Sequence, residues 1–151
     1  MHKIIVKKKI QVPLNIAHKR IWDISSWASF WNPLQKIEIL YDDGLHQDFK
    51  MLVDWQGRNS WVRTIRFCNP NLDVAFFSPQ PPPPTSIHQG LWQFAVLTDT
   101  LTELTAVRYF ELPQAELEES EEYSMRLIQF SQDFQTRLQD LLQKLGDSCE
   151  R

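Results

Sequence analysis

The chain has 151 residues, of which 42% are hydrophobic and 23% are charged, and its formal net charge is −3. This length and balance predict a single soluble domain, 1–151, that is large enough to bury a core. The negative charge gives no basic footprint for nucleic acid, and no apolar run reaches the roughly 20 residues that span a bilayer, so neither a nucleic-acid partner nor a transmembrane segment is expected. Two cysteines and the lack of a signal-like apolar stretch indicate a cytoplasmic location.

The first part of the chain predicts one strand followed by two short helices. Residues 3–12 alternate between apolar and polar side chains, which is typical of a half-buried strand. Pro13 ends this strand, and Asn15 is expected to be the N-cap of a helix that runs through Ile24. The aromatic segment 27–33, which ends in a proline, predicts a second short helix packed on the core.

From Leu34 onward the hydrophobic period changes from about 3.6 residues to 2, which predicts six antiparallel strands. The expected strands begin at Ile37 and then cover 49–55, 61–67, 72–78, 87–97 and 101–112. Turn sequences such as Asp42-Asp43-Gly44 and Asn69-Pro70-Asn71 separate them. The four prolines of 81–84 predict a stiff loop, which we interpret as part of a cavity mouth and not as a ligand for a proline-binding domain.

The last third of the chain predicts one long amphipathic helix, 117–145. Its apolar residues recur at steps of three and four and therefore share one face: Tyr123, Leu127, Phe130, Phe134, Leu138, Leu141 and Leu145. Glutamates near its start oppose the positive end of the helix dipole, and Gly146 is expected to end it in a left-handed conformation. A meander of strands must cover one face, and this helix has the necessary apolar surface. The predicted fold class is α+β, with a seven-stranded curved antiparallel sheet around a long C-terminal helix and two short helices after the first strand.

The order of these elements and three short motifs resemble a known superfamily. The motifs are Val12-Pro13 leading into Ile21-Trp22-Asp23-Ile24, Trp27 followed by Trp31-Asn32-Pro33, and Gly90-Leu91-Trp92-Gln93-Phe94. They look like the START-type helix-grip (SRPBCC) proteins, and within these the chain is most similar to the polyketide cyclase/dehydrase (aromatase/cyclase-like) branch. The resemblance implies a hydrophobic cavity between sheet and long helix that takes a lipid, a polyketide or another flat apolar molecule.

The fourth strand departs from the pattern of this branch. Aromatase/cyclases show Trp-x-Ser-x-Arg here, and the arginine is implied to polarise a substrate carbonyl inside the cavity. This chain reads Trp61-Val62-Arg63-Thr64-Ile65, so the serine position holds Arg63 and the arginine position holds Ile65. We expect Trp61 and Arg63 to face the cavity, where Arg63 would meet a ketone, phenolate or carboxylate. The alternative is an arginine that packs its stem on Trp61 and reaches solvent.

Aromatic, apolar and cationic side chains are expected to bind the ligand in a cavity of ~300–1,000 Å³. The expected ligand-binding residues are Trp31, Phe49, Met51, Trp61, Arg63, Trp92, Phe94, Arg108, Tyr123, Leu127, Phe130 and Phe134. His88, beside the proline loop, is a candidate for acid–base work. No residues have metal-ligand spacing and no glycine-rich phosphate loop occurs, so neither a metal nor an organic cofactor is expected.

Two functions remain open, and the sequence identifies neither catalytic residues nor an oligomeric state. The first is a cofactor-free cyclase, aromatase or dehydratase that acts on a polyketide-like substrate. The second is a non-catalytic carrier or sensor for a lipid, a quinone or an isoprenoid. The similarity to the cyclase branch favours the enzyme, whereas the lack of an acid–base constellation favours the binding protein.

Overall fold

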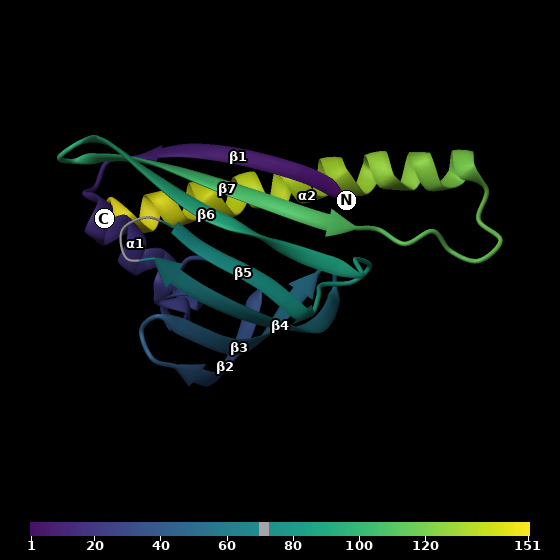
Figure 1. The fold of residues 1–151 in the computed structure, drawn as a ribbon, viewed down its shortest axis with the longest axis horizontal. Coiled ribbons are helices and arrows are strands. Elements are labelled where there is room, and N and C mark those ends of the chain that lie inside the picture. Colours follow the sequence, from purple (N-terminus) through teal and green to yellow (C-terminus); the bar gives the residue numbers. More distant parts are fainter. Residues whose placement is uncertain (70–72) are drawn as a thin grey trace.

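The computed structural model describes residues 1–69 and 73–151, and these form the expected α+β helix-grip architecture (Figure 1). Seven antiparallel strands of the described residues make one sheet in the order β1-β7-β6-β5-β4-β3-β2. The strands are β1 (His2–Ile10), β2 (Leu34–Asp42), β3 (His46–Trp55), β4 (Arg58–Asn69), β5 (Asp73–Gln80), β6 (Ile87–Thr98) and β7 (Leu101–Glu111). The helices are α1 (Leu14–Trp22), the 3-10 helix η1 (Ile24–Ser29) and α2 (Ser120–Cys149).

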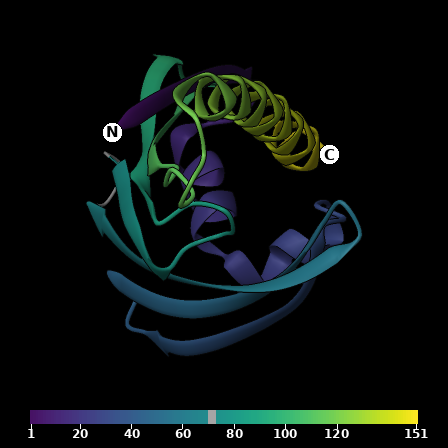
Figure 2. The ribbon, with the colours of Figure 1, turned by 90° about the vertical axis from the view of Figure 1, so that its right-hand side faces the viewer.

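The sheet curves so that its β1 edge lies against α2, while its other edge strand, β2, lies near η1. Figure 2 shows this curvature end-on, with α2 across the open side of the sheet and with α1 and η1 between them. On one edge, β1 pairs with β7 and packs directly against α2. The expected turn at Asp42-Asp43-Gly44 joins β2 to β3, and Gly44 adopts a φ of 86° there. No helix in the described part of the chain is both long enough and apolar enough to cross a membrane.

The predicted apolar stripe of α2 lies against the core. Phe134, Leu138, Leu141 and Leu145 are buried, while Tyr123, Leu127 and Phe130 are partly buried against the same core. The apolar row of β1 faces this helix. Lys8 occupies one position of that row, and its side chain also lies against α2. Its Nζ donates a hydrogen bond to Oε1 of Gln143 at 2.9 Å, so the aliphatic stem covers α2 while the charge stays near solvent.

The end of α2 differs from the prediction because Gly146 serves packing and not termination. The helix continues to Cys149, and Gly146 is buried inside its last turns. A Cβ at this position would lie 3.4 Å from the Lys8 side chain and 3.6 Å from that of Ile10. Glycine therefore lets α2 lie close to β1, and the expected left-handed end at this residue is wrong.

The two short helices are present, but their boundaries differ from the expected ones. α1 begins at Leu14 with Pro13 as its N-cap, so the expected N-cap at Asn15 is wrong. The second short helix is η1, which starts before the expected 27–33 segment. The hydroxyl of Ser26 donates to the Asp23 carbonyl at 2.8 Å and that of Ser29 donates to the Ser26 carbonyl at 2.6 Å. These bonds span three residues and stabilise the tight turns of a 3-10 helix.

Candidate functional site

An apolar cavity of about 140 Å³ lies between the concave face of the sheet and α2. Aromatic rings from four parts of the chain form much of its wall, among them Trp27 of η1, Phe49 of β3, Trp92 of β6 and Phe134 of α2. The volume is smaller than the ~300–1,000 Å³ expected from the sequence, because these large rings extend into the space. An engineered cavity of about 150 Å³ binds benzene, so a space of about 140 Å³ suits a molecule of about one ring.

Seven of the twelve residues predicted to bind the ligand line this cavity. They are Trp31, Phe49, Met51, Trp92, Arg108, Phe130 and Phe134. Phe94 and Leu127 pack against the core beside it, and the Phe94 ring lies 5.3 Å from that of His18. Pro82 and Pro83 also line the cavity, so the proline loop lies where a cavity mouth was expected.

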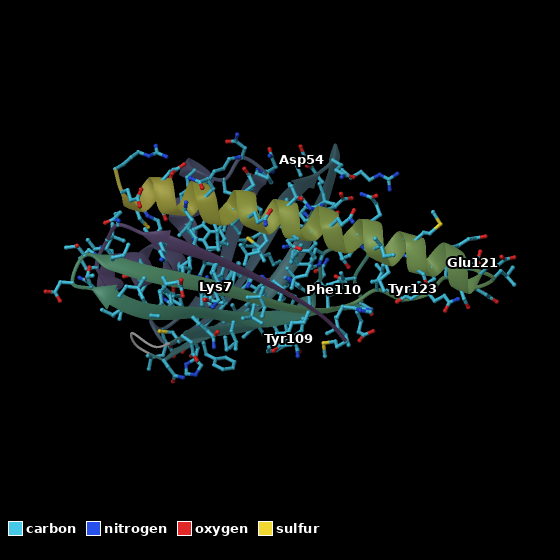
Figure 3. The ribbon with its side chains drawn as sticks, turned by 90° about the horizontal axis from the view of Figure 1, so that it is seen from above. Lys7, Asp54, Tyr109, Phe110, Glu121 and Tyr123 are labelled. Atoms are coloured by element: carbon cyan, nitrogen blue, oxygen red, sulfur yellow. The ribbon has the colours of Figure 1, made fainter. Side chains whose placement is uncertain are left out.

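Tyr123 was predicted to reach the ligand, but it instead fixes the start of α2. Figure 3 shows Glu121 and Tyr123 on the first turns of this helix, which extend past the ends of the strands. The Tyr123 hydroxyl donates to the Leu112 carbonyl at 2.6 Å. The Arg126 guanidinium pairs with the Glu118 carboxylate at 2.9 Å. These contacts attach the projecting turns to the segment after β7, and they leave Tyr123 outside the cavity.

The predicted orientation of Trp61 and Arg63 is wrong, because both side chains lie on the convex face of the sheet. Trp61 is 39% exposed, although a buried cavity wall was expected. The Arg63 guanidinium makes a bidentate ion pair with Asp48, with Nε and Nη2 at 3.0 and 2.6 Å from its two carboxylate oxygens. This pairing lowers the pKa of Asp48 below its ordinary value. Arg63 is therefore an ion-paired surface residue.

The pairing of β3 with β4 explains the reversed orientation. The turn at Gln56-Gly57 makes Trp55 the partner of Arg58, so Met51 pairs with Val62 and Phe49 pairs with Thr64. Residues directly opposite each other in an antiparallel pair point to the same face. Since Phe49 and Met51 face the cavity, Val62 and Thr64 must face it too. Arg66 follows on the same row and also lines the cavity.

Arg66, which the sequence analysis did not single out, is a buried structural arginine. It is 2% exposed, and its guanidinium donates to the carbonyls of Ile21 and Trp22 at 2.9 and 2.8 Å. Its Nε donates to Oε1 of Gln47 at 2.9 Å. Burial lowers the pKa of Arg66 to about 9, so it remains charged at neutral pH. The cation stabilises the negative end of α1 and attaches that helix to β3 and β4.

Arg108 is a second buried arginine, with few partners of its own. It is 5% exposed, and its Cζ lies 4.4 Å from the centre of the Trp92 ring and 4.7 Å from that of Phe76. Its Nη1 donates to the Val107 carbonyl at 3.1 Å and makes a longer contact with the Leu91 carbonyl at 3.4 Å. Among residues 1–69 and 73–151, no carboxylate pairs with Arg108. Burial, together with the charge of Arg66, lowers the pKa of Arg108 to about 9.

His88 completes the polar part of the wall. Its Nδ1 lies 3.3 Å from the Ser78 hydroxyl, which lies 3.2 Å from the Thr64 hydroxyl. Its Nε2 is buried and has no hydrogen-bond partner among the described residues. Burial, together with the charge of Arg108, lowers the pKa of His88 to about 3, so the imidazole is neutral at neutral pH.

Because His88 is buried and its pKa is lowered, the stability of the protein is expected to depend on pH. The unfolded chain takes up a proton at its ordinary pKa of 6.5, whereas the native state does so only near 3, so stability falls as the pH drops through this window. Between pH 7 and 5 the expected loss is about 2 kcal/mol. Urea denaturation of the wild type and of His88→Gln at both pH values measures it. His18→Gln measures the share of the other histidine whose pKa burial lowers. An unchanged pH dependence in His88→Gln contradicts the assignment.

A stacked pair closes the side of the cavity between α2 and β3. The Cζ of Arg137 lies 3.3 Å from the centre of the Trp55 ring, and its Nε donates to the Asp133 carbonyl at 3.2 Å. Outside this pair, a second hollow of about 180 Å³ is lined by both residues together with Asp54 and Asp140. Figure 3 shows Asp54 on the opposite side of α2 from Lys7 of β1. A ligand that reaches the inner cavity by this route must displace the Arg137–Trp55 contact.

Solved structures share this fold over nearly the whole chain. A Zhui aromatase/cyclase from a Streptomyces species matches with a TM-score of 0.84 and 17% identity, covering 99% of this chain and 94% of that chain. The protein TTHA0849 of Thermus thermophilus matches with a TM-score of 0.81 and 15% identity, covering 98% and 97%. A START superfamily protein from Mycobacterium smegmatis matches with a TM-score of 0.65 and 14% identity, covering 93% and 99%. No protein-family model and no curated protein matches the sequence. These structures confirm the predicted helix-grip fold.

Proposed function

We propose that the chain binds a compact, flat, hydrophobic small molecule in the cavity between the sheet and α2. The observation that carries this proposal is the cavity itself, a space of about 140 Å³ with aromatic walls inside an otherwise packed core. Native interiors rarely keep voids of this size without a use for them. The fold likeness to aromatase/cyclases and to a START superfamily protein supports the same conclusion. A quinone ring or another single ring matches the volume of this cavity.

Filling the cavity is expected to abolish binding of a simple hydrocarbon such as toluene. At ten times its Kd, toluene should stabilise the wild type by about 1.4 kcal/mol, which raises Tm by about 3–6 °C. Val62→Phe places a ring in the space and should weaken binding at least ~10-fold. Ile65→Phe is the matched control, because Ile65 lies on the same strand, and its opposite-face position leaves the cavity unchanged. Tryptophan fluorescence measures both affinities. Equal losses in the two variants, or no binding to the wild type, contradict the proposal.

The second candidate is a cofactor-free cyclase or dehydratase. Thr64 and Arg66 stand two residues apart on the inward face of β4, as the serine and arginine do in the aromatase/cyclase pattern, and His88 supplies a neutral base. However, Arg66 already donates to three protein acceptors, and no aspartate or glutamate of the described residues lines the cavity. Incubation with a short poly-β-ketone thioester distinguishes the two functions. An aromatic product that His88→Gln fails to form favours the enzyme.

A further inference from the structure

We propose that the ligand carries an anionic oxygen, a carboxylate or a phenolate, on a single flat ring, and that this oxygen binds between the Arg108 guanidinium and Nε2 of His88. The inference rests on the proposed function, because it names the chemical class of the ligand for the same cavity. Its support comes from the charge around the cavity, from the free donors of Arg108, from the unpaired nitrogen of His88 and from the volume.

Positive charge gathers around this cavity although the chain carries a net charge of −3. Arg66, Arg108 and Arg137 line it, and none of the described aspartates or glutamates does. Arg66 is held by acceptors from α1 and β3, and Arg137 is stacked on Trp55 at the outer side. Arg108 is therefore the cation that remains available to a ligand inside.

Most of the donors of Arg108 have no acceptor among residues 1–69 and 73–151. Only Nη1 makes hydrogen bonds to described residues, and both of these go to backbone carbonyls. Nε and Nη2 therefore keep free N–H groups next to the cavity. A buried cation without a counter-charge is unfavourable, and an anion in the cavity supplies both the charge and the acceptors that are missing. A neutral ligand would supply only acceptors.

His88 contributes a donor of its own to the same anion. When the Ser78 hydroxyl donates to Nδ1, the ring proton lies on Nε2, and the Thr64 hydroxyl then donates to Ser78. Nε2 is buried without a hydrogen-bond partner among the described residues, and the His88 side chain lines the cavity. Buried polar atoms of native proteins nearly always have a partner. A ligand oxygen satisfies this one.

The two groups meet at one ring. Phe76 lies 4.7 Å from Cζ of Arg108 and 5.2 Å from the centre of the His88 ring. Gly90 pairs directly with Arg108 across the ladder and stands between His88 and Trp92 on the inward row of β6. A Cβ on Gly90 would lie 3.1 Å from the Phe76 ring and 2.0 Å from the Val107 carbonyl oxygen. Glycine therefore lets the Val107 carbonyl and the Phe76 ring approach the backbone of β6, which keeps Phe76 beside both groups. The cavity volume of about 140 Å³ suits a ligand of about one ring.

Pairs of ligands with the same shape and different charge test the proposal on the purified full chain. Benzoate is compared with benzamide, and 4-nitrophenol with 4-nitroanisole, with toluene as the apolar reference. The protein should bind each anion roughly 10- to 150-fold more tightly than its neutral partner. Bound 4-nitrophenol should show the absorption band of its anion at a pH where the free dye is mostly neutral. The benzoate and nitrophenol arms show whether a carboxylate or a phenolate is preferred.

Substitutions then assign the preference to the two residues. Arg108→Met should lose the 10- to 150-fold preference for both anions while keeping the affinity for toluene. His88→Phe should lose part of it, and Arg63→Met, on the convex face, should lose none. Toluene binding without any preference for an anion, in the wild type or equally in all variants, overturns this inference and leaves the proposed function intact. Failure of all five ligands to bind the wild type overturns both.

Discussion

Replacing Arg66 by methionine is expected to lower the free energy of unfolding by about 3–5 kcal/mol. The substitution leaves the buried carbonyl of Ile21 and the amide oxygen of Gln47 without their donor, and it weakens the bonding of the Trp22 carbonyl. Each buried acceptor without a donor costs about 1–3 kcal/mol. The loss corresponds to a fall in Tm of about 10 °C for a chain of this size. Urea and thermal denaturation measure it.

The matched control is Arg63→Met, three residues earlier on β4 and on the opposite face of the sheet. Its ion pair with Asp48 is partly exposed, with side-chain exposures of 39% and 20%. Exposed pairs of this kind contribute about 0–1 kcal/mol. If Arg66→Met costs no more than Arg63→Met, the guanidinium does not attach α1 to the sheet, and Arg66 becomes available for substrate chemistry again.

The fold could be predicted because two strong periodicities agree with each other. The stripe of α2 repeats over seven apolar residues, and few structures other than a helix lying on a large core satisfy such a repeat. The alternation after Leu34 requires strands, and short turns require these strands to be antiparallel neighbours. The predicted ends of the helices were less accurate, because one residue type can serve several local roles. Glycine often ends a helix, but Gly146 lies inside α2 and allows the helix to pack closely on β1.

The site was predicted less well because β4 has apolar residues on both faces. Trp61 and Ile65 lie on one face of β4, and Val62 lies on the other. The face with the larger side chains was predicted to line the cavity, and this prediction was wrong. The signal that could have decided is the turn at Gln56-Gly57. A two-residue hairpin turn pairs Trp55 with Arg58, so an odd-numbered inward residue on β3 faces an even-numbered one on β4. Once Phe49 is placed inside, this rule turns Arg63 outward and Arg66 inward.

The sequence placed Arg108 among the expected ligand-binding residues, but it did not reveal the structural role of Arg66. Arg66 and Arg108 each occupy a position in the inward-facing row of a strand, and both are almost fully buried. Their difference arises from segments distant in the chain. Arg66 meets the last carbonyls of α1, whereas Arg108 meets the rings of Phe76 and Trp92 at the cavity wall. Such partners depend on the register of several strands at once, which residue patterns along a single strand do not define.

Replacing Arg108 by methionine is therefore expected to have the opposite sign from Arg66→Met. Burying an unpaired cation costs several kcal/mol. The two ring contacts of Arg108 return up to about 2 kcal/mol each, and a methionine thioether between the same rings recovers part of this. We expect Arg108→Met to raise the free energy of unfolding by about 1–3 kcal/mol, or Tm by about 2–10 °C, in the absence of ligand. A fall in stability of the free protein would show that Arg108 is structural.

Adding an anion should reverse this order of stabilities. Benzoate at 100 times its Kd stabilises the native wild type by about 2.7 kcal/mol, whereas Arg108→Met at the same concentration gains little because its affinity is much lower. The Tm of the wild type should therefore rise to or above that of the variant as benzoate is added, while toluene should raise both by similar amounts. This reversal is the behaviour of a residue that lowers the stability of the free fold and recovers it on binding an anion. Melting curves of both proteins over a range of benzoate concentrations measure it. Parallel curves, with the difference between the two proteins unchanged at every concentration, contradict an anion-binding role for Arg108.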